Sequence, residues 1–241
     1  MYIFCSKNTE TLSANEGDEE AMNIFDVIGP VMIGPSSSHT AGAVRLGKLA
    51  LAILGEPVKE AVIGLHGSFA QTYKGHGTDL ALAAGLQGWA TDDARIPKSF
   101  EAIHKAGITI SFKTINLGDF AHPNSVKFWL TGVNGNTCKV TGASIGGGRV
   151  SITNIDDFPV EFSGEFPTLL TMHNDRPGTI ALVTSILSTH GVNVAQMRVF
   201  RKQKGGLAVM IVETDQPVDD AEMEVIRQLP HIDSVRRIQL V

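Results

Sequence analysis

The chain has 241 residues, of which 43% are hydrophobic, and this is enough to bury the core of one large or two smaller domains. Its formal net charge of -5 argues against a nucleic-acid partner, because proteins that bind nucleic acid gather Lys and Arg on one face. No apolar run approaches the roughly 18 residues that a membrane span needs. We therefore expect a soluble protein that binds neither nucleic acid nor a membrane.

The N-terminal segment, residues 1–23, is acidic and lacks the basic and apolar stretches of a secretory signal. We predict that it forms a flexible extension. The only two cysteines, Cys5 and Cys138, lie in different segments and have no Cys-x-x-Cys spacing. Isolated cysteines are typical of cytoplasmic proteins, whose thiols stay reduced.

The most distinctive motif is the glycine-bracketed stretch of residues 33–42, Ile-Gly-Pro-Ser-Ser-Ser-His-Thr-Ala-Gly. It runs directly into an amphipathic helix that reaches Leu54, so its hydroxyl groups and His39 are expected at a helix N-terminus. The unpaired N–H groups and the positive dipole at such an end favour an anion such as a carboxylate. The same dipole favours a neutral imidazole, which makes His39 a candidate general base. The alternative is a simple N-cap with spare hydroxyl groups.

A second glycine-rich stretch covers residues 64–79. A short buried strand over residues 61–65 is predicted to end at His66, a loop follows, and Thr78 and Asp79 are suitable caps for the next helix. Ligands gather outside the strand ends in folds where strands feed helices, so both motifs are expected to face one crevice. The alternative for His66 is a strand-end histidine that bonds to the backbone.

The rest of the first domain is predicted to be mixed α/β, with a helix over residues 98–106 and strands where apolar residues alternate. These strands cover residues 108–113, 126–130, 138–141 and 149–154. The glycines of the stretch 142–149 either let a ligand approach the backbone closely or form a tight strand connection. Residues 156–167 contain Asp, Pro and Gly, show no strand period and are predicted to be a linker.

From residue 168 onward the pattern is strand, helix, strand, strand, helix, strand, which is the βαββαβ order of a ferredoxin-like domain. The expected elements cover residues 168–173, 178–189, 192–201, 207–214, 219–229 and 234–240. Gly191 is expected just past the first of these helices, and Asp219 at the N-cap of the second. Because this arrangement hosts many functions, it identifies none by itself.

The four motifs of the first domain resemble the beta subunit of iron-sulfur-dependent L-serine dehydratases over residues 24–155. They are the stretches at residues 33–42, 64–79, 122–125 (His-Pro-Asn-Ser) and 142–149. The resemblance implies a cytoplasmic lyase that removes water and then ammonia from L-serine to give pyruvate, in amino-acid catabolism and gluconeogenesis. It also implies a 4Fe-4S cluster. Such a cluster normally takes three or four thiolates, more than this chain has, so the partner alpha subunit is expected to ligate it and to complete a heterodimer.

Residues 168–241 resemble an ACT domain, through the turn Asn-Asp-Arg-Pro-Gly at residues 174–178 and the stretch Gly-Val-Asn-Val at residues 191–194. In that family the turn helps to bind amino acids where two such domains pair side by side. The resemblance therefore implies self-association and a regulatory ligand site. The residues implied for that site are Asn174, Asp175, Gly178 and Asn193. The alternative is a domain that serves only as scaffold or for dimerisation.

The resemblance and the helix-end placement together give the expected site residues. We expect His39 to be the base, with His66 and His76 as secondary catalytic candidates, and no metal ligand in this chain. The expected ligands of the carboxylate and ammonium groups of L-serine are Ser36, Ser37, Ser38, Thr40, Ser68 and Asn124.

Two other interpretations remain open. One is a non-catalytic serine-binding module, like the allosteric substrate-binding and ACT domains of some D-3-phosphoglycerate dehydrogenases. The other is an assembly subunit that binds no ligand. The histidines on glycine-rich loops favour the enzyme, because a sensor needs donors for a carboxylate and acceptors for an ammonium group but no neutral base.

Overall fold

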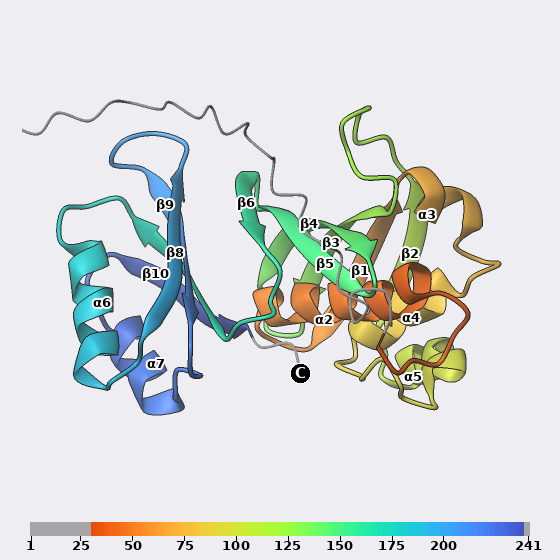
Figure 1. Cartoon of the computed structure of the whole chain (residues 1–241), viewed down its shortest axis with the longest axis horizontal. Coiled ribbons are helices and arrows are strands. Elements are labelled where there is room, and N and C mark those ends of the chain that lie inside the picture. The colour runs from red at the N-terminus through yellow and green to blue at the C-terminus, as the bar shows by residue number, and fades with distance from the viewer. Residues whose placement is uncertain (1–29, 239–241) are drawn as a thin grey trace, which may run out of the picture.

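The computed structural model describes residues 30–238. They form two β-sheets with helices packed on them, and the two units lie side by side along the long axis of the molecule (Figure 1). The mixed α/β class predicted from the sequence is confirmed. None of the helices in this part of the chain has the length and apolar character to cross a bilayer. The predicted flexible extension, residues 1–23, lies outside the described residues.

The larger sheet has six strands in the order β2-β1-β3-β4-β5-β6. β1 and β2 run parallel, and all the remaining pairs of neighbouring strands run antiparallel. The strands are β1 (Val58–Leu65), β2 (Thr109–Thr114), β3 (Ser125–Gly132), β4 (Thr137–Gly146), β5 (Arg149–Ile155) and β6 (Phe158–Phe162). Val126, Phe128 and Leu130 on β3 are buried and alternate with less buried residues, so the predicted alternation is confirmed there.

One long helix, α2, crosses this sheet over β3, β4 and β5, and α4 packs against α2. The helical segments are η1 (Ser37–Ala41), α2 (Gly42–Leu54), α3 (Gly67–Thr72), α4 (Thr78–Gly85), η2 (Ile96–Lys98) and α5 (Ser99–Lys105). The two long helices touch at glycines, because a Cβ built on Gly47 would lie 2.7 Å from the carbonyl oxygen of Leu82. This close contact sets the position of α2 relative to α4, and with it the distance between the starts of the two helices.

Two segments that the sequence analysis left irregular are regular in the structure. The loop predicted after His66 begins with the helix α3, and the predicted linker 156–167 contains the edge strand β6. Asp156 and Asp157 form the two-residue turn before β6, with positive φ angles of 48° and 67°. Turns of this kind usually contain glycine, so the two aspartates do not indicate a hairpin, and the prediction of a linker without a strand is wrong.

The smaller sheet has four antiparallel strands in the order β10-β7-β9-β8, with two helices on one face. Its elements are β7 (Thr168–Asn174), α6 (Thr179–Thr189), β8 (Val194–Arg201), β9 (Leu207–Thr214), α7 (Asp220–Arg227) and β10 (Ile232–Ile238). The predicted βαββαβ order is confirmed. Asp219 caps α7 in a capping box with Glu222, and Gly191 has a φ of 73° just past α6, as expected.

The smaller sheet is buried on both faces. Leu169 and Met210 point toward α6 and α7, whereas Leu170, Val209 and Ile211 belong to the hydrophobic core of the first unit. The contacts across this boundary come mainly from α2 with β10 and from β6 with β8. The two sheets are therefore joined by one continuous apolar contact.

Candidate active site

The helix α2 is preceded by one wider helical turn, η1, which carries the Ser-Ser-Ser-His-Thr motif. Ser36 has an extended backbone and is the N-cap, and its Oγ accepts a hydrogen bond from the backbone N–H of His39 at 3.2 Å. Wider turns of this π type frequently occur at functional sites. His39 therefore lies in the first turn of a continuous helical segment, where the sequence places it.

His39 is the centre of a small cluster of side chains. Its Nε2 atom is 3.3 Å from Oγ of Ser68, and its Nδ1 atom is 3.4 Å from Oγ of Ser36. The rings of Phe69 and His76 meet the imidazole edge to face, with centroid distances of 5.2 and 4.8 Å. α3 carries Ser68 and Phe69, and the turn before α4 carries His76. The two glycine-rich motifs thus converge on one place, as the sequence predicts.

The environment of His39 favours the neutral imidazole. The side chain is partly buried, and this burial lowers its pKa below the usual 6.5. A charge on the neighbouring His76 lowers the same pKa further, by a smaller amount. A neutral imidazole is the form that accepts a proton. The sequence predicts a neutral imidazole from the helix dipole, whereas in the folded chain burial is the largest cause.

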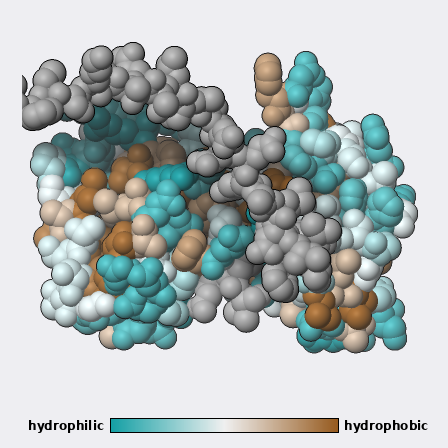
Figure 2. Space-filling view, in the orientation of Figure 1, coloured by the Kyte–Doolittle hydropathy of each residue, from teal (hydrophilic) through white to brown (hydrophobic). Residues whose placement is uncertain are grey.

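His66 makes a different contact. It is the N-cap of α3, and its Nδ1 atom accepts a hydrogen bond from the backbone N–H of Leu117 at 3.3 Å. This bond ties the end of β1 to the loop between β2 and β3, which projects from the first unit (Figures 1 and 2). Within residues 30–238 no hydrogen bond joins His66 to His39 or Ser68. The contact matches the backbone-bonded alternative, and a catalytic role for His66 stays a prediction.

Three hydroxyl groups on the elements around this cluster are buried and have no hydrogen-bond partner among residues 30–238. They belong to Thr40 in η1, Thr78 at the start of α4 and Ser144 on β4. A Cβ built on Gly42 would collide with the side chain of Ser144, so β4 holds this hydroxyl directly against the start of α2. A buried hydroxyl without a partner costs about 1–3 kcal/mol, so it is a candidate to bond a ligand.

Sequence reasoning assigned no role to Ser144 and took Thr78 for a helix cap. The N-cap of α4 is instead Gly77, which has a positive φ of 67°. No local sequence pattern indicates that either hydroxyl is buried without a partner, because their burial depends on how α2 packs against β4 and α4. Gly42 and Gly47 allow this packing, and two glycines within one helix are the sequence feature that indicates such a close approach.

The other predicted substrate-binding residues lie around the same turn. Ser36, Ser37 and Ser38 are partly buried. The carbonyl oxygen of Asn124 accepts a hydrogen bond from the N–H of Ser144 at 3.1 Å, so the His-Pro-Asn turn is anchored to β4 beside the start of α2. Contacts of these side chains with a substrate stay predictions.

The glycine stretch 142–149 forms a tight strand connection, the second of the two roles left open by the sequence. Gly147 and Gly148, with φ angles of 58° and 79°, link β4 to β5 in a two-residue turn that requires positive φ at both positions. The guanidinium of Arg45 on α2 donates to the carbonyl of Gly148 at 2.8 Å. The turn is thereby fastened to α2, the helix that directly follows η1 and His39.

The residues predicted to bind a regulatory ligand bond to other residues of the chain. A carboxylate oxygen of Asp175 accepts hydrogen bonds from the N–H of Gly205 at 2.9 Å and from Arg201 at 2.6 Å, and these bonds, that from Gly205 first, lower the pKa of Asp175. The amide of Asn193 donates to Asp215 at 2.6 Å. Asn174 donates to Asp233 at 3.3 Å, and Gly178 is the N-cap of α6.

Comparison with known proteins relates the first unit to a described family. The serine dehydratase beta chain family matches residues 23–154, and the ACT domain family matches residues 168–231. The chain belongs to the serine dehydratase beta chain family. It is 43% identical to the probable L-serine dehydratase beta chain of Bacillus subtilis and 39% identical to the L-serine dehydratase beta chain of Peptoniphilus asaccharolyticus. Both matches cover 90% of this chain and 97% of the relative.

The alternative from the sequence also has a counterpart among these relatives. A D-3-phosphoglycerate dehydrogenase of Synechocystis is 28% identical over 82% of this chain, but the match covers only 36% of that enzyme. The serine dehydratase beta chains are more similar, and the matches cover 90% of this chain and 97% of each relative. These relatives favour the enzyme interpretation over the regulatory one.

The iron-sulfur cluster implied by this family does not fit the cysteines of the described chain. Cys138 is buried on β4, and this burial raises the pKa of its thiol to about 12, which disfavours the thiolate that iron requires. Cys5 lies outside the described residues. Residues 30–238 contain no group of three His, Cys, Asp or Glu side chains that could hold a metal ion. A cluster would therefore need thiolates from another chain.

Proposed function

We propose that the chain is the beta subunit of an L-serine ammonia-lyase and that L-serine binds at the turn that begins α2. The observation that carries this proposal is the partly buried His39, which is bracketed by Ser36 and Ser68 at a helix N-terminus. The proposed reaction requires a neutral base and donors for the carboxylate, and the nearby unpartnered hydroxyls can supply further hydrogen bonds to the substrate. The similarity to serine dehydratase beta chains over 90% of the chain supports it.

His39 is proposed as the base that removes the α-proton. The proton passes from Cα of L-serine to an imidazole nitrogen, the double bond between Cα and Cβ forms, and the β-hydroxyl leaves as water after it gains a proton. The resulting aminoacrylate takes up water and releases ammonia to give pyruvate. Ser36 and Ser68 hold the imidazole from both nitrogens, which limits its rotation.

The hydroxyl groups are proposed to bind the polar groups of L-serine. Ser36, Ser37 and Ser38 lie where the N-terminal N–H groups of the helical segment gather, which suits the carboxylate. Ser68, Thr40 and Asn124 complete the predicted set. His76 is exposed beside His39, and we propose that it orients the substrate or moves a proton rather than acting as the first base.

The partner is proposed to be an alpha subunit that brings a 4Fe-4S cluster, since the beta chain name of the relatives implies a second chain. A cluster held there would supply a Lewis acid for the leaving hydroxyl. We propose a cytoplasmic location, with which the free thiol of Cys138 agrees.

For the C-terminal domain, residues 168–241, we propose self-association with a regulatory amino acid beside the turn 174–178. β8 is an edge strand on which Met197 and Val199 are 39% and 36% exposed, so it offers a surface for a second copy. A cavity of 380 Å³ beside the turn is lined by Asp175, Gly178 and Lys204, among others, and is large enough for a small amino acid.

The test is anaerobic co-purification of this chain with a candidate alpha subunit, followed by assays for iron, sulfide and pyruvate formed from L-serine. We expect pyruvate only when both chains are present. A complex that contains the cluster and binds L-serine yet forms no pyruvate would refute the proposal and favour the serine-sensing module. Dependence of pyruvate formation on His39, with serine binding retained, would separate the two further, because a sensor needs no base.

A further inference from the structure

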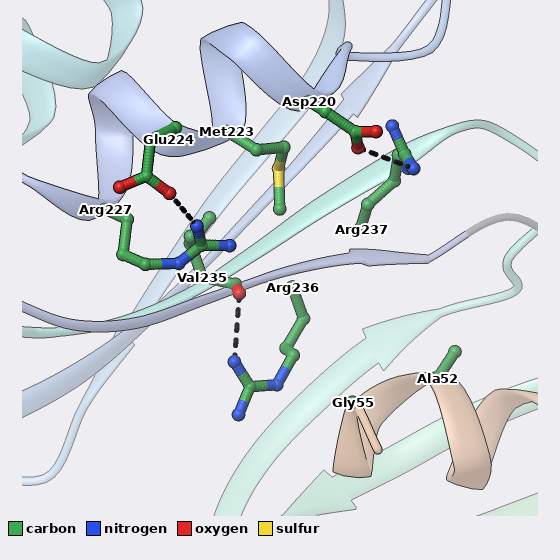
Figure 3. Close-up of a pocket in the computed structure, with 9 residues that line it drawn as sticks. All are labelled: Ala52, Gly55, Asp220, Met223, Glu224, Arg227, Val235, Arg236 and Arg237. Atoms are coloured by element: carbon green, nitrogen blue, oxygen red, sulfur yellow. Dashed lines mark hydrogen bonds and ion pairs between the residues drawn. The ribbon is translucent and has the colours of Figure 1, made fainter. Parts of the chain in front are cut away.

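A cavity of 470 Å³ lies where the two sheets meet (Figure 3). The end of α2 contributes Ala52 and Gly55, and the second unit contributes Arg227 from α7 and Arg236 from β10. Its volume is in the range of small-molecule sites, which is about 300–1,000 Å³. It is distinct from the His39 cluster, which lies at the other end of α2.

Arg236 is the notable side chain of this cavity. Figure 3 shows it extending from β10 toward the end of α2, and a Cβ built on Gly55 would collide with its guanidinium. Its Nη1 atom donates to the carbonyl of its own neighbour Val235 at 3.1 Å, whereas its Nε atom is buried and unpartnered within residues 30–238. A guanidinium has five N–H donors, so most of its capacity is unused.

The other two arginines of the cavity already have carboxylate partners. Arg227 pairs with Glu224 one turn away on α7, and Arg237 pairs with Asp220 at 3.0 Å. No carboxylate of the described residues pairs with Arg236. Three guanidinium groups and two carboxylates leave one positive charge in the cavity without compensation, and a partly buried charge in that state is costly unless it is paired.

We propose that this cavity binds a small anionic metabolite, whose carboxylate or phosphate group accepts hydrogen bonds from the Arg236 guanidinium. A planar guanidinium matches either oxyanion in a fork. Ala52, Met223 and Val235 provide an apolar wall for the carbon part of the ligand. Because the contacts come from both units, the bound anion bridges the two sheets. α2 connects this site to η1, so occupancy is positioned to affect the His39 turn.

The test measures binding of two probes, inorganic phosphate and succinate, to the full chain by calorimetry and by thermal unfolding at constant ionic strength. Saturable binding of phosphate indicates a phosphate ligand, and binding of succinate alone indicates a carboxylate. We expect Arg236→Met to weaken binding about tenfold or more, since a hydrogen-bonded charge is lost. The matched control is Arg149→Met, an exposed arginine on β5, which should bind as the wild type does.

A purely structural role for Arg236 predicts a different result. If Arg236 served only packing, Arg236→Met would lower the unfolding temperature in chloride buffer as much as in phosphate. The proposal expects no loss in chloride, because an uncompensated charge is removed, and a loss of the ligand-dependent rise. Arg236→Lys, which keeps the charge without the fork, should bind weakly. Absence of saturable binding of both probes to the wild type, or undiminished binding to Arg236→Met, overturns the proposal.

Discussion

Two turns at helix starts differ in how far their polar groups are satisfied. At the start of α2, the hydroxyls of Thr40 and Ser144 have no hydrogen-bond partner among residues 30–238. At the start of α6 the hydroxyl of Thr179 is likewise buried and unpartnered, but the side chains predicted to bind a ligand are already bonded: Asp175 to Arg201 and Gly205, and the nearby Asn193 to Asp215. Both turns were expected from the sequence to bind an amino acid.

A ligand gains binding free energy where it bonds polar groups that the chain leaves unpartnered. An unpartnered buried hydroxyl costs about 1–3 kcal/mol, which a ligand that bonds it recovers. A ligand at the α6 turn would first have to break bonds that the chain already makes, although the cavity beside the turn still has room for one. The bonds that Asp175 and Asn193 already make support our proposal that catalysis occurs at η1 rather than at the α6 turn.

The largest expected effect comes from His39. In the proposed two-chain enzyme, His39→Asn keeps a polar side chain of similar size but removes the proposed base, and we expect turnover to fall by about 10²- to 10⁴-fold. The control is His104→Asn, an exposed histidine on α5 that should leave turnover unchanged. Native mass spectrometry monitors the complex in both variants. Near-normal turnover of His39→Asn with an intact complex would contradict the assignment of His39 as the base.

The contact between Gly42 and Ser144 gives the next effect. Gly42→Ala places a methyl group where the side chain of Ser144 lies, and overpacking of this kind costs about 1–3 kcal/mol. Alanine gains up to about 1 kcal/mol of helix propensity over glycine, so the net loss is smaller than the clash alone. Urea unfolding measures the change.

Two further variants separate the clash from other effects of Gly42→Ala. Gly75→Ala is the control, because its Cβ would meet its nearest neighbour, the carbonyl oxygen of Thr72, at 3.7 Å, which is ordinary contact. Gly42→Ala combined with Ser144→Gly should regain stability. A Gly42→Ala variant as stable as the wild type would mean that Ser144 is free to move away from α2.

The fold was largely predictable because most elements carry local patterns. The alternation on β3 and the capping residue Asp219 of α7 act over a few neighbouring positions, so the sequence shows them directly. β6 was missed although Phe158, Val160 and Phe162 alternate with exposed residues. Its turn residues are aspartates rather than glycines, and Pro159 is tolerated because β6 is an edge strand.

The candidate site was predictable only as a list of residues. The serines and His39 share one turn, so their proximity follows from the sequence, but the bond between His39 and Ser68 depends on how α3 packs beside η1. The unpartnered state of Ser144 depends on β4 and α2 together. In the second unit, the bond from Arg201 to Asp175 joins residues that only sheet formation brings together. Such pairings have no local signature.

A variant at the α6 turn tests whether its bonded polar groups are needed for turnover. Asp175→Asn weakens the bonds to Arg201 and Gly205, so the amide of Gly205 should exchange its hydrogen faster. Turnover at saturating L-serine should stay unchanged, since no catalytic group is touched. A loss of turnover in a complex that still assembles would mean that this turn holds a ligand needed for catalysis, and the distinction between the two turns would fail.

The smallest expected effect is a change in pH dependence when His76 is replaced. The pKa of His39 is lowered first by burial and then by charge on His76, so the acidic limb of kcat/KM should lie below pH 6.5. His76→Gln removes only the second cause. The pKa of His39 then rises toward 6.5, and the limb moves to higher pH.

The stability of the chain should follow the same ionisation of His39. Between the lowered pKa of folded His39 and the usual 6.5, the unfolded chain binds more protons than the folded one. The contribution of His39 to stability is therefore complete above pH 6.5 and is lost as the pH falls through the folded pKa. His76→Gln narrows this window, whereas His104→Gln should move neither the kinetic limb nor the stability curve. A limb above pH 6.5, or one that His76→Gln leaves in place, would show that His39 is not the titrating base.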